Sequence, residues 1–301
     1  MMRRDWLGPG YLVGALAGAA LLLWGAEARA EGLNGRTWQM SMDPGSVGTI
    51  RGAHAPAPGT LVMGLSGDYL QNPIAPRQQG IYHDLLQSRF TLEPSLVFGL
   101  PKAFAISVRV PIVTYDKGYR TNGQNLDKAG ISSPGLGVLI PIMRSATTDT
   151  RVSVRGELVL PVGSRADYRQ DDGFAGRGEL VFGGPIGPIF AVFSGGAWIA
   201  PARMLQAARL NDAVIAGAGL RIPDKTPVAA IGSIDVRVEV QGDHNAYGLG
   251  AGGLELRLGS TFLRAMAGGG AGDTVTTPKF WMGFSVLQAI ELFPDYRYFS
   301  K

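Results

Sequence analysis

The sequence has no cysteine, only three histidines and 17% charged residues. The absence of cysteine excludes lipoproteins. Without cysteine the chain has neither a disulfide framework nor a lipid-acceptor site, so it is not a lipoprotein. Beyond residue 30 it also has no apolar run close to the roughly 20 residues that a membrane-spanning helix needs. Any passage across a membrane must therefore use strands.

The first 30 residues have the features of an export signal. Arg3 and Arg4 form a basic start, residues 11–24 are apolar, and Ala28-Arg29-Ala30 is a small-x-small cleavage site. Removal of residues 1–30 leaves 25 basic and 22 acidic residues, a net charge of +3. Such a weak charge gives no basic surface for nucleic acid, and the sequence holds no nucleic-acid motif.

From residue 59 onward the hydropathy pattern predicts about twelve β segments of roughly 10 to 14 residues, with ten or fourteen as the alternatives. The expected segments are 59–70, 86–98, 103–115, 132–144, 150–161, 174–184, 188–199, 212–222, 227–240, 246–258, 261–270 and 278–288.

Short and long connections alternate between these segments. The short ones are 99–102, 145–149, 184–187, 223–226 and 259–260. Those after the odd segments are mostly longer and polar, namely 71–85, 116–131, 162–173 and 200–211, followed by the shorter 241–245 and 271–277. This arrangement is typical of outer-membrane barrels, which have short periplasmic turns and longer external loops. It predicts an all-β, antiparallel, up-and-down transmembrane β-barrel over residues 59–288. Residues 31–58 would be a periplasmic lead-in or a plug in the lumen, and 289–301 a short tail.

Aliphatic and charged residues alternate strictly in Ile234 to Val240 and again in Leu254 to Leu258. Since successive side chains of a strand point to opposite faces, one face is aliphatic and the other charged. With lipid outside, the charged face lines the lumen. The expected lumen residues, a possible permeation path, are Arg89, Glu93, Arg109, Arg155, Glu157, Arg177, Glu179, Asp235, Arg237, Glu239, Glu255 and Arg257. Their signs balance, which favours ion pairs in a narrow interior over an ion-selective pore. A soluble exported β-sandwich, with the charged face in water, is the alternative.

Three short stretches carry a resemblance to a known family: Gly67 to Pro73, Leu158 to Gly163, and Gly268 to Gly272 followed by Thr277 to Gly283. With them the chain resembles the N-terminal barrel region of outer membrane protein A-like proteins of Gram-negative bacteria, without the peptidoglycan-binding domain that commonly follows. The resemblance implies a location in the outer membrane, contact with its lipid, and insertion by the barrel assembly machinery.

Few residues suggest chemistry. No predicted strand contains a histidine, which argues against a barrel-wall phospholipase, but His83-Asp84 and Asp243-His244 would lie near the mouth and leave a hydrolase as an alternative. His54 lies in the lead-in. Asp167, Asp171 and Asp172 lack the spacing of a recognised calcium site. We therefore expect no cofactor or metal, and a non-enzymatic barrel that is structural or a narrow channel for small polar solutes.

Overall fold

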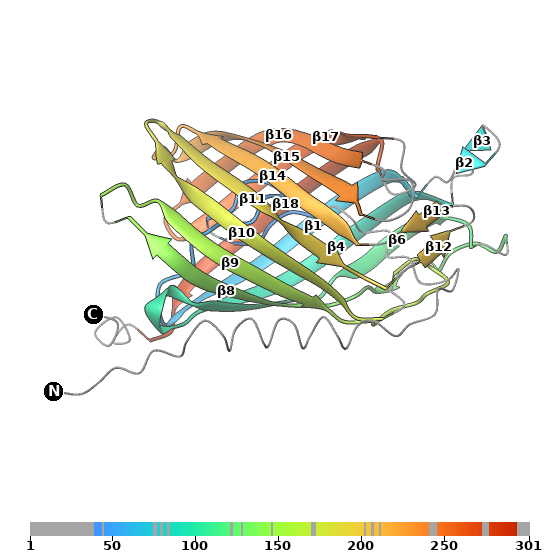
Figure 1. Ribbon diagram of the computed structural model, residues 1–301, viewed down its shortest axis with the longest axis horizontal. Coiled ribbons are helices and arrows are strands. Elements are labelled where there is room, and N and C mark those ends of the chain that lie inside the picture. Colours follow the sequence, from blue (N-terminus) through green and yellow to red (C-terminus); the bar gives the residue numbers. More distant parts are fainter. Residues whose placement is uncertain are drawn as a thin grey trace.

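The chain forms a closed antiparallel β-barrel of twelve strands, which confirms the predicted fold (Figure 1). The computed structural model describes residues 39–43, 45–74, 77–78, 81–82, 85–120, 123–127, 129–145, 147–169, 173–201, 203–205, 208–210, 212–240, 246–272 and 277–293. None of the helices in these ranges is long and apolar enough to cross a membrane.

The wall strands lie close to the predicted segments. They are β1 (Thr60–Ile74), β4 (Leu86–Gly99), β5 (Ala105–Arg109), β8 (Gly135–Arg144), β9 (Arg151–Val159), β10 (Ala175–Ile186), β11 (Ile189–Ile199), β14 (Ala213–Ile222), β15 (Val228–Glu239), β16 (Ala246–Leu258), β17 (Thr261–Ala271) and β18 (Phe280–Glu291). Each strand pairs with its neighbours in the sequence, and β1 pairs with both β18 and β4, which closes the ring.

The connections sort by length between the two ends of the barrel. The tight turns lie at one end, with the short 3-10 helix η1 (Pro101–Ala103) in the first of them. The opposite end, on the right in Figure 1, carries the long connections. Two of these contain small hairpins that the sequence did not predict, β2 (Arg77–Gln78) with β3 (Ile81–Tyr82) and β12 (Arg203–Leu205) with β13 (Ala208–Leu210).

The third predicted strand, 103–115, is interrupted. It forms β5 and then β6 (Ile112–Gly118), separated by Val110 and Pro111, and the facing β7 (Gly130–Ile131) is separated from β8. Pro111 has no amide hydrogen for the ladder. The break is bridged by single hydrogen bonds, from Val110 N to Pro94 O at 3.1 Å and from Ser132 N to Pro111 O at 2.9 Å.

The outer surface of the wall is apolar, whereas the inner surface carries the charged residues together with apolar clusters. Ile234 and Leu254 are each 60% exposed, whereas the next residues along the same strands, Asp235 and Glu255, are 3% and 1% exposed. A soluble sandwich would show the opposite distribution, with its aliphatic faces buried. An apolar exterior on a closed barrel is the surface that lipid covers.

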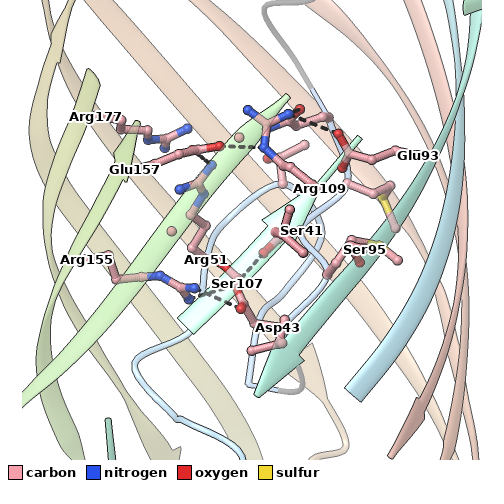
Figure 2. A pocket seen from close by; sticks show the side chains of 18 of the residues that line it. Ser41, Asp43, Arg51, Glu93, Ser95, Ser107, Arg109, Arg155, Glu157 and Arg177 are labelled. Carbon is pink, nitrogen blue, oxygen red and sulfur yellow. Dashed lines mark hydrogen bonds and ion pairs between the residues drawn. The ribbon is translucent and has the colours of Figure 1, made fainter. Parts of the chain in front are cut away.

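Residues 39–43 and 45–58, the inserted segment, lie inside the barrel (Figure 2). Its turn is closed by the bridge between Val47 and Ile50, whose side chains belong to a buried apolar cluster with Val192 and Ile231 of the wall. Wall glycines leave room for the segment, since a Cβ on Gly219 would lie 2.9 Å from Val47 Cβ. The predicted boundaries of the signal peptide, lead-in and tail stay predictions.

Candidate functional site: the charged lumen

A chain of ion pairs crosses the middle of the lumen (Figure 2). Arg51 of the inserted segment pairs with Glu157 on β9, and its Nε lies 3.9 Å from Glu179 Oε2 on β10. Glu157 also pairs with Arg109 on β5, whose Nη1 is 2.9 Å from Glu93 Oε2 on β4. Buried carboxylates are stable as ions only when they are paired and hydrogen-bonded in this way. The pairs therefore fix the inserted segment to the wall.

Two further wall arginines hold the segment from opposite sides. Arg155 on β9 lies 2.7 Å from Asp43 Oδ2 and donates to Gly52 O at 2.8 Å. Arg264 on β17 donates to Ser46 Oγ at 2.8 Å and to Ser41 O at 3.2 Å. In the strand order β9 is six positions from β17, which is halfway round a ring of twelve. The segment thus spans the lumen and is anchored at both walls.

The other predicted lumen residues also face inward. Arg177 and Glu179 pair along one strand at 2.8 Å, as do Arg257 and Glu255 at 2.7 Å. Three more lie on β15, where Asp235, Arg237 and Glu239 are all buried.

The three β15 residues have both aromatic and charged neighbours. Arg237 lies over the Trp198 ring, 5.9 Å from its centroid. Asp235 interacts electrostatically with Arg177 and Arg237.

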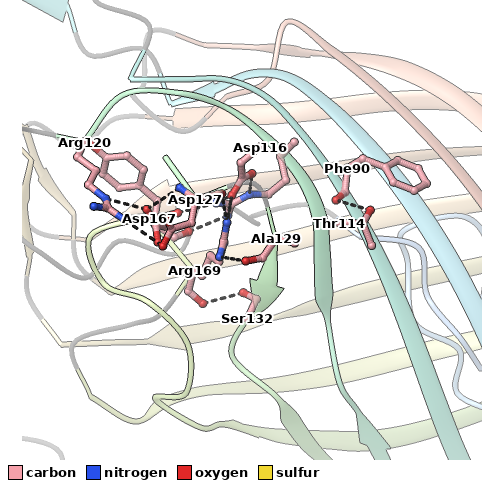
Figure 3. A network of polar contacts seen from close by, with 11 residues as sticks. Phe90, Thr114, Asp116, Arg120, Asp127, Ala129, Ser132, Asp167 and Arg169 are labelled. Carbon is pink, nitrogen blue, oxygen red and sulfur yellow. Dashed lines mark hydrogen bonds and ion pairs between the residues drawn. The ribbon is translucent and has the colours of Figure 1, made fainter. Parts of the chain in front are cut away.

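Arg89, in contrast, belongs to a separate network at the long-loop end. Figure 3 shows Asp116, Asp167 and Arg169 of this network. The Nε of Arg89 lies 2.7 Å from Asp116 Oδ1, and its Nη1 and Nη2 donate to Tyr168 O and Asp167 O, each at 2.7 Å. Arg169 binds Asp116 from the other side, at 2.9 Å. These contacts hold the connection after β9 inside the mouth of the barrel.

Two residues of the connection after β9, Asp167 and Tyr168, have shifted pKa values. Burial disfavours ionisation of Asp167, but Arg120, whose Nε is 2.9 Å from Asp167 Oδ1, and hydrogen bonds from Ser164 and the Asp127 amide together outweigh it and lower the pKa to about 2. Burial raises the pKa of Tyr168 to about 12. Asp171 and Asp172 lie outside the described residues. Among the residues that are described, no group of three or more histidine, cysteine or acidic side chains could hold a metal ion.

Little space remains around the central ion pairs. A cavity of about 50 Å³ lies between the inserted segment and β4, β5 and β9, with Met42, Ser95, Ser107, Arg109 and Glu157 among its lining residues. A larger recess of about 750 Å³ opens at the short-turn end, beside His54, Phe190 and Arg221. The lumen is therefore wide at this end and narrow in the middle.

The mouth histidines proposed for a hydrolase, His83 and His244, lie outside the described residues, as do Asp84 and Asp243. His54 lies at the short-turn end, with Nε2 3.9 Å from Asp149 Oδ2. Burial, together with the charge of nearby Arg151, lowers the pKa of His54 to about 4, so this imidazole is neutral at neutral pH.

Several charged residues of the site were not predicted. Arg51 and Asp43 lie in a segment without periodicity, which gave no sign of their direction. Asp116 and Arg169 lie at a strand end and in a loop. Arg264 could have been found, because it occupies an inward position of the predicted strand 261–270.

Comparison with solved structures identifies the fold. The COG4313 outer membrane channel from Pseudomonas putida F1 matches 83% of this chain and 100% of its own length, with a TM-score of 0.65 and 12% identity. The chain has the fold of an outer-membrane β-barrel.

Two autotransporter domains are also similar to this barrel. The translocator domain of NalP from Neisseria meningitidis matches 77% of this chain and 89% of its own, with a TM-score of 0.45 and 12% identity. The β domain of the Bordetella autotransporter BrkA matches 78% and 100%, with a TM-score of 0.42 and 16% identity. No protein-family model and no curated protein matches the chain. The resemblance to outer membrane protein A-like barrels is not shown by these matches and stays a prediction.

Proposed function

We propose that this protein is a non-enzymatic outer-membrane barrel that conducts small polar solutes through a narrow lumen of mixed charge. The observation that carries the proposal is the central chain of ion pairs from Arg51 through Glu157 to Arg109, beside a cavity of about 50 Å³. An export signal over residues 1–30, insertion by the barrel assembly machinery and contact with outer-membrane lipid belong to the same proposal.

The charge pattern supports a passage that does not strongly select ions by sign. Each central carboxylate contacts at least one arginine, so the described residues of the lumen form no ring of one sign, which a strongly selective pore would need. The remaining cavity has room for a few water molecules, since one water needs about 10–15 Å³ of such volume. Passage of anything larger requires the inserted segment to shift.

A mobility assay and bilayer recordings test the proposal. The refolded protein should migrate differently on gels with and without heating, as closed barrels resist detergent, and should show small conductance steps in a planar bilayer. Absence of both conductance and swelling of proteoliposomes in small polar solutes would overturn the channel and leave a structural role.

Arg51→Ala should raise the conductance and shift selectivity toward cations, because Glu157 and Glu179 each lose a positive neighbour. Arg144→Ala is the matched control, since it removes the same charge from a side chain that is 67% exposed and pairs with Asp149 in the β8–β9 turn rather than with a central carboxylate. Equal effects of the two variants would show that the central pairs do not line the path.

A further inference from the structure

A row of hydroxyl groups runs along the inner face of three adjacent strands, β18, β1 and β4. Ser285 on β18 is directly opposite Ser66 on β1, and Ser66 is opposite Glu93 on β4. Thr91 and Ser95 flank Glu93 on the same inward face. We call Ser66, Thr91, Ser95 and Ser285 the hydroxyl strip. From Ser95 to Thr91 it covers about 14 Å along the strand, at about 3.4 Å per residue.

The hydroxyl strip is buried and is not satisfied by the described part of the protein. Ser66 and Thr91 are 0% exposed, Ser285 is 1% and Ser95 is 7% exposed. None of the four hydroxyl oxygens has a hydrogen-bond partner among the described residues. Trp281, the next inward residue on β18 beyond Gly283, likewise has a buried indole N–H without one. Since a buried hydroxyl without a partner is costly, four on one wall indicate groups that bind water or a solute.

The surface opposite the strip consists of methionines from the inserted segment. A Cβ on Gly283 would lie 2.9 Å from Met40 Cγ, and one on Gly64, opposite Ser95 in the register, would collide with Met42 Cε. Met40, Met42 and Ser95 also line the central cavity (Figure 2). Methionine is unbranched and adapts its shape easily, so this surface can yield without breaking an ion pair.

We propose that the hydroxyl strip and the two methionines form a hydrated path for water and small uncharged polyols. Hydroxyls both donate and accept hydrogen bonds, which suits neutral hydroxylated solutes. The thioethers cannot replace the hydration shell of an ion, so this path disfavours charged solutes. This inference rests on the proposed function, because it assigns the solute class and the route of that channel.

The natural absence of cysteine allows a direct test by accessibility. Ser66→Cys, Thr91→Cys and Ser285→Cys are prepared singly in the full-length, refolded protein and treated with a neutral methanethiosulfonate and with its anionic and cationic analogues. Ser153→Cys is the matched control, because Ser153 is also 0% exposed but its hydroxyl donates to Ala53 O at 2.7 Å. Heat-dependent gel mobility verifies that each variant is folded.

The strip cysteines should react with the neutral reagent at least ten times faster than the cysteine at position 153, and glycerol should slow that reaction. Rates no faster than the control would overturn the inference even if the protein conducts. Faster reaction with either charged reagent than with the neutral one would overturn the solute class. Labelling of the strip without conductance and without glycerol-driven swelling of proteoliposomes would support a hydrated strip while overturning the proposed channel.

Discussion

The seating of the inserted segment can be tested with a pair of alanine substitutions at glycines of the same backbone conformation. Gly48 in the inserted segment has φ of 59° and Gly187 in the β10–β11 turn has φ of 62°. A Cβ on Gly48 would lie 2.6 Å from Ser233 Oγ and 2.8 Å from Met266, whereas a Cβ on Gly187 would meet nothing within 4 Å. The two substitutions therefore share backbone strain and differ only in collision.

The expected magnitudes follow from these two effects. Left-handed backbone costs a residue with a Cβ about 1–2 kcal/mol at either position. Overpacking adds about 1–3 kcal/mol at Gly48 alone. Ser233 cannot rotate away without losing its 3.3 Å contact with Thr49. Gly48→Ala should therefore increase the population with a displaced segment by at least about 5-fold relative to Gly187→Ala, since displacement relieves the collision at Gly48 and leaves Gly187 unchanged.

Limited trypsin digestion measures this population, because Arg51 is a trypsin site whose side chain is only 13% exposed. Cleavage that leaves Gly52 as a new N-terminus, followed by mass spectrometry, should be faster in Gly48→Ala by the same factor. Equal cleavage rates in the two variants would refute the packing argument and would mean that Gly48 has no tight neighbours.

Three other substitutions test separate parts of the structure. Ile234→Lys places a charge on the outer face of β15 and should cost about 2–4 kcal/mol in a bilayer, measured by urea unfolding in lipid; a neutral effect would favour a soluble protein. Arg89→Gln leaves Asp116 buried with Arg169 as its remaining partner and should lower stability by less than the about 3–5 kcal/mol that an uncompensated charge costs, with the unfolding midpoint as the readout. Because the folded pKa of His54 is lowered to about 4, stability should be complete above pH 6.5 and fall as the pH drops from 6.5 toward 4. His54→Gln should flatten that slope, and an unchanged slope would contradict the assignment.

The wall of the barrel was predictable from the sequence, because side chains alternate between the two faces of a strand. With lipid outside, the aliphatic face must point outward and the charged face inward. Ile234 and Asp235 lie on opposite faces, as predicted from their alternation. The interruption at Pro111 was not predicted, since the alternation of residues 103–115 continues through it. The small hairpins were missed because strands of two or three residues are too short to show periodicity.

The interior was less predictable, because pairing depends on contacts between residues distant in sequence. Arg89 and Glu93 are four residues apart on one inward face, yet Arg89 binds Asp116 while Glu93 binds Arg109. The spacing of the two residues does not predict these different ion-pair partners. The partners of Arg89 follow from the connection after β9, which folds over it. The inserted segment likewise has no pattern that predicts its place in the lumen.

The charge of the lumen is balanced both with and without the inserted segment. That segment supplies a cation, Arg51, and an anion, Asp43, so the lumen is balanced with or without it. If the segment moves out, water can replace Asp43 beside Arg155 and Arg51 beside Glu157, since ions in a hydrated lumen lose little. The contacts of Val47 and Ile50 with the apolar wall have no such replacement. The apolar contacts therefore supply the part of the anchoring that water cannot replace, whereas the charged residues can serve both the occupied and the open barrel.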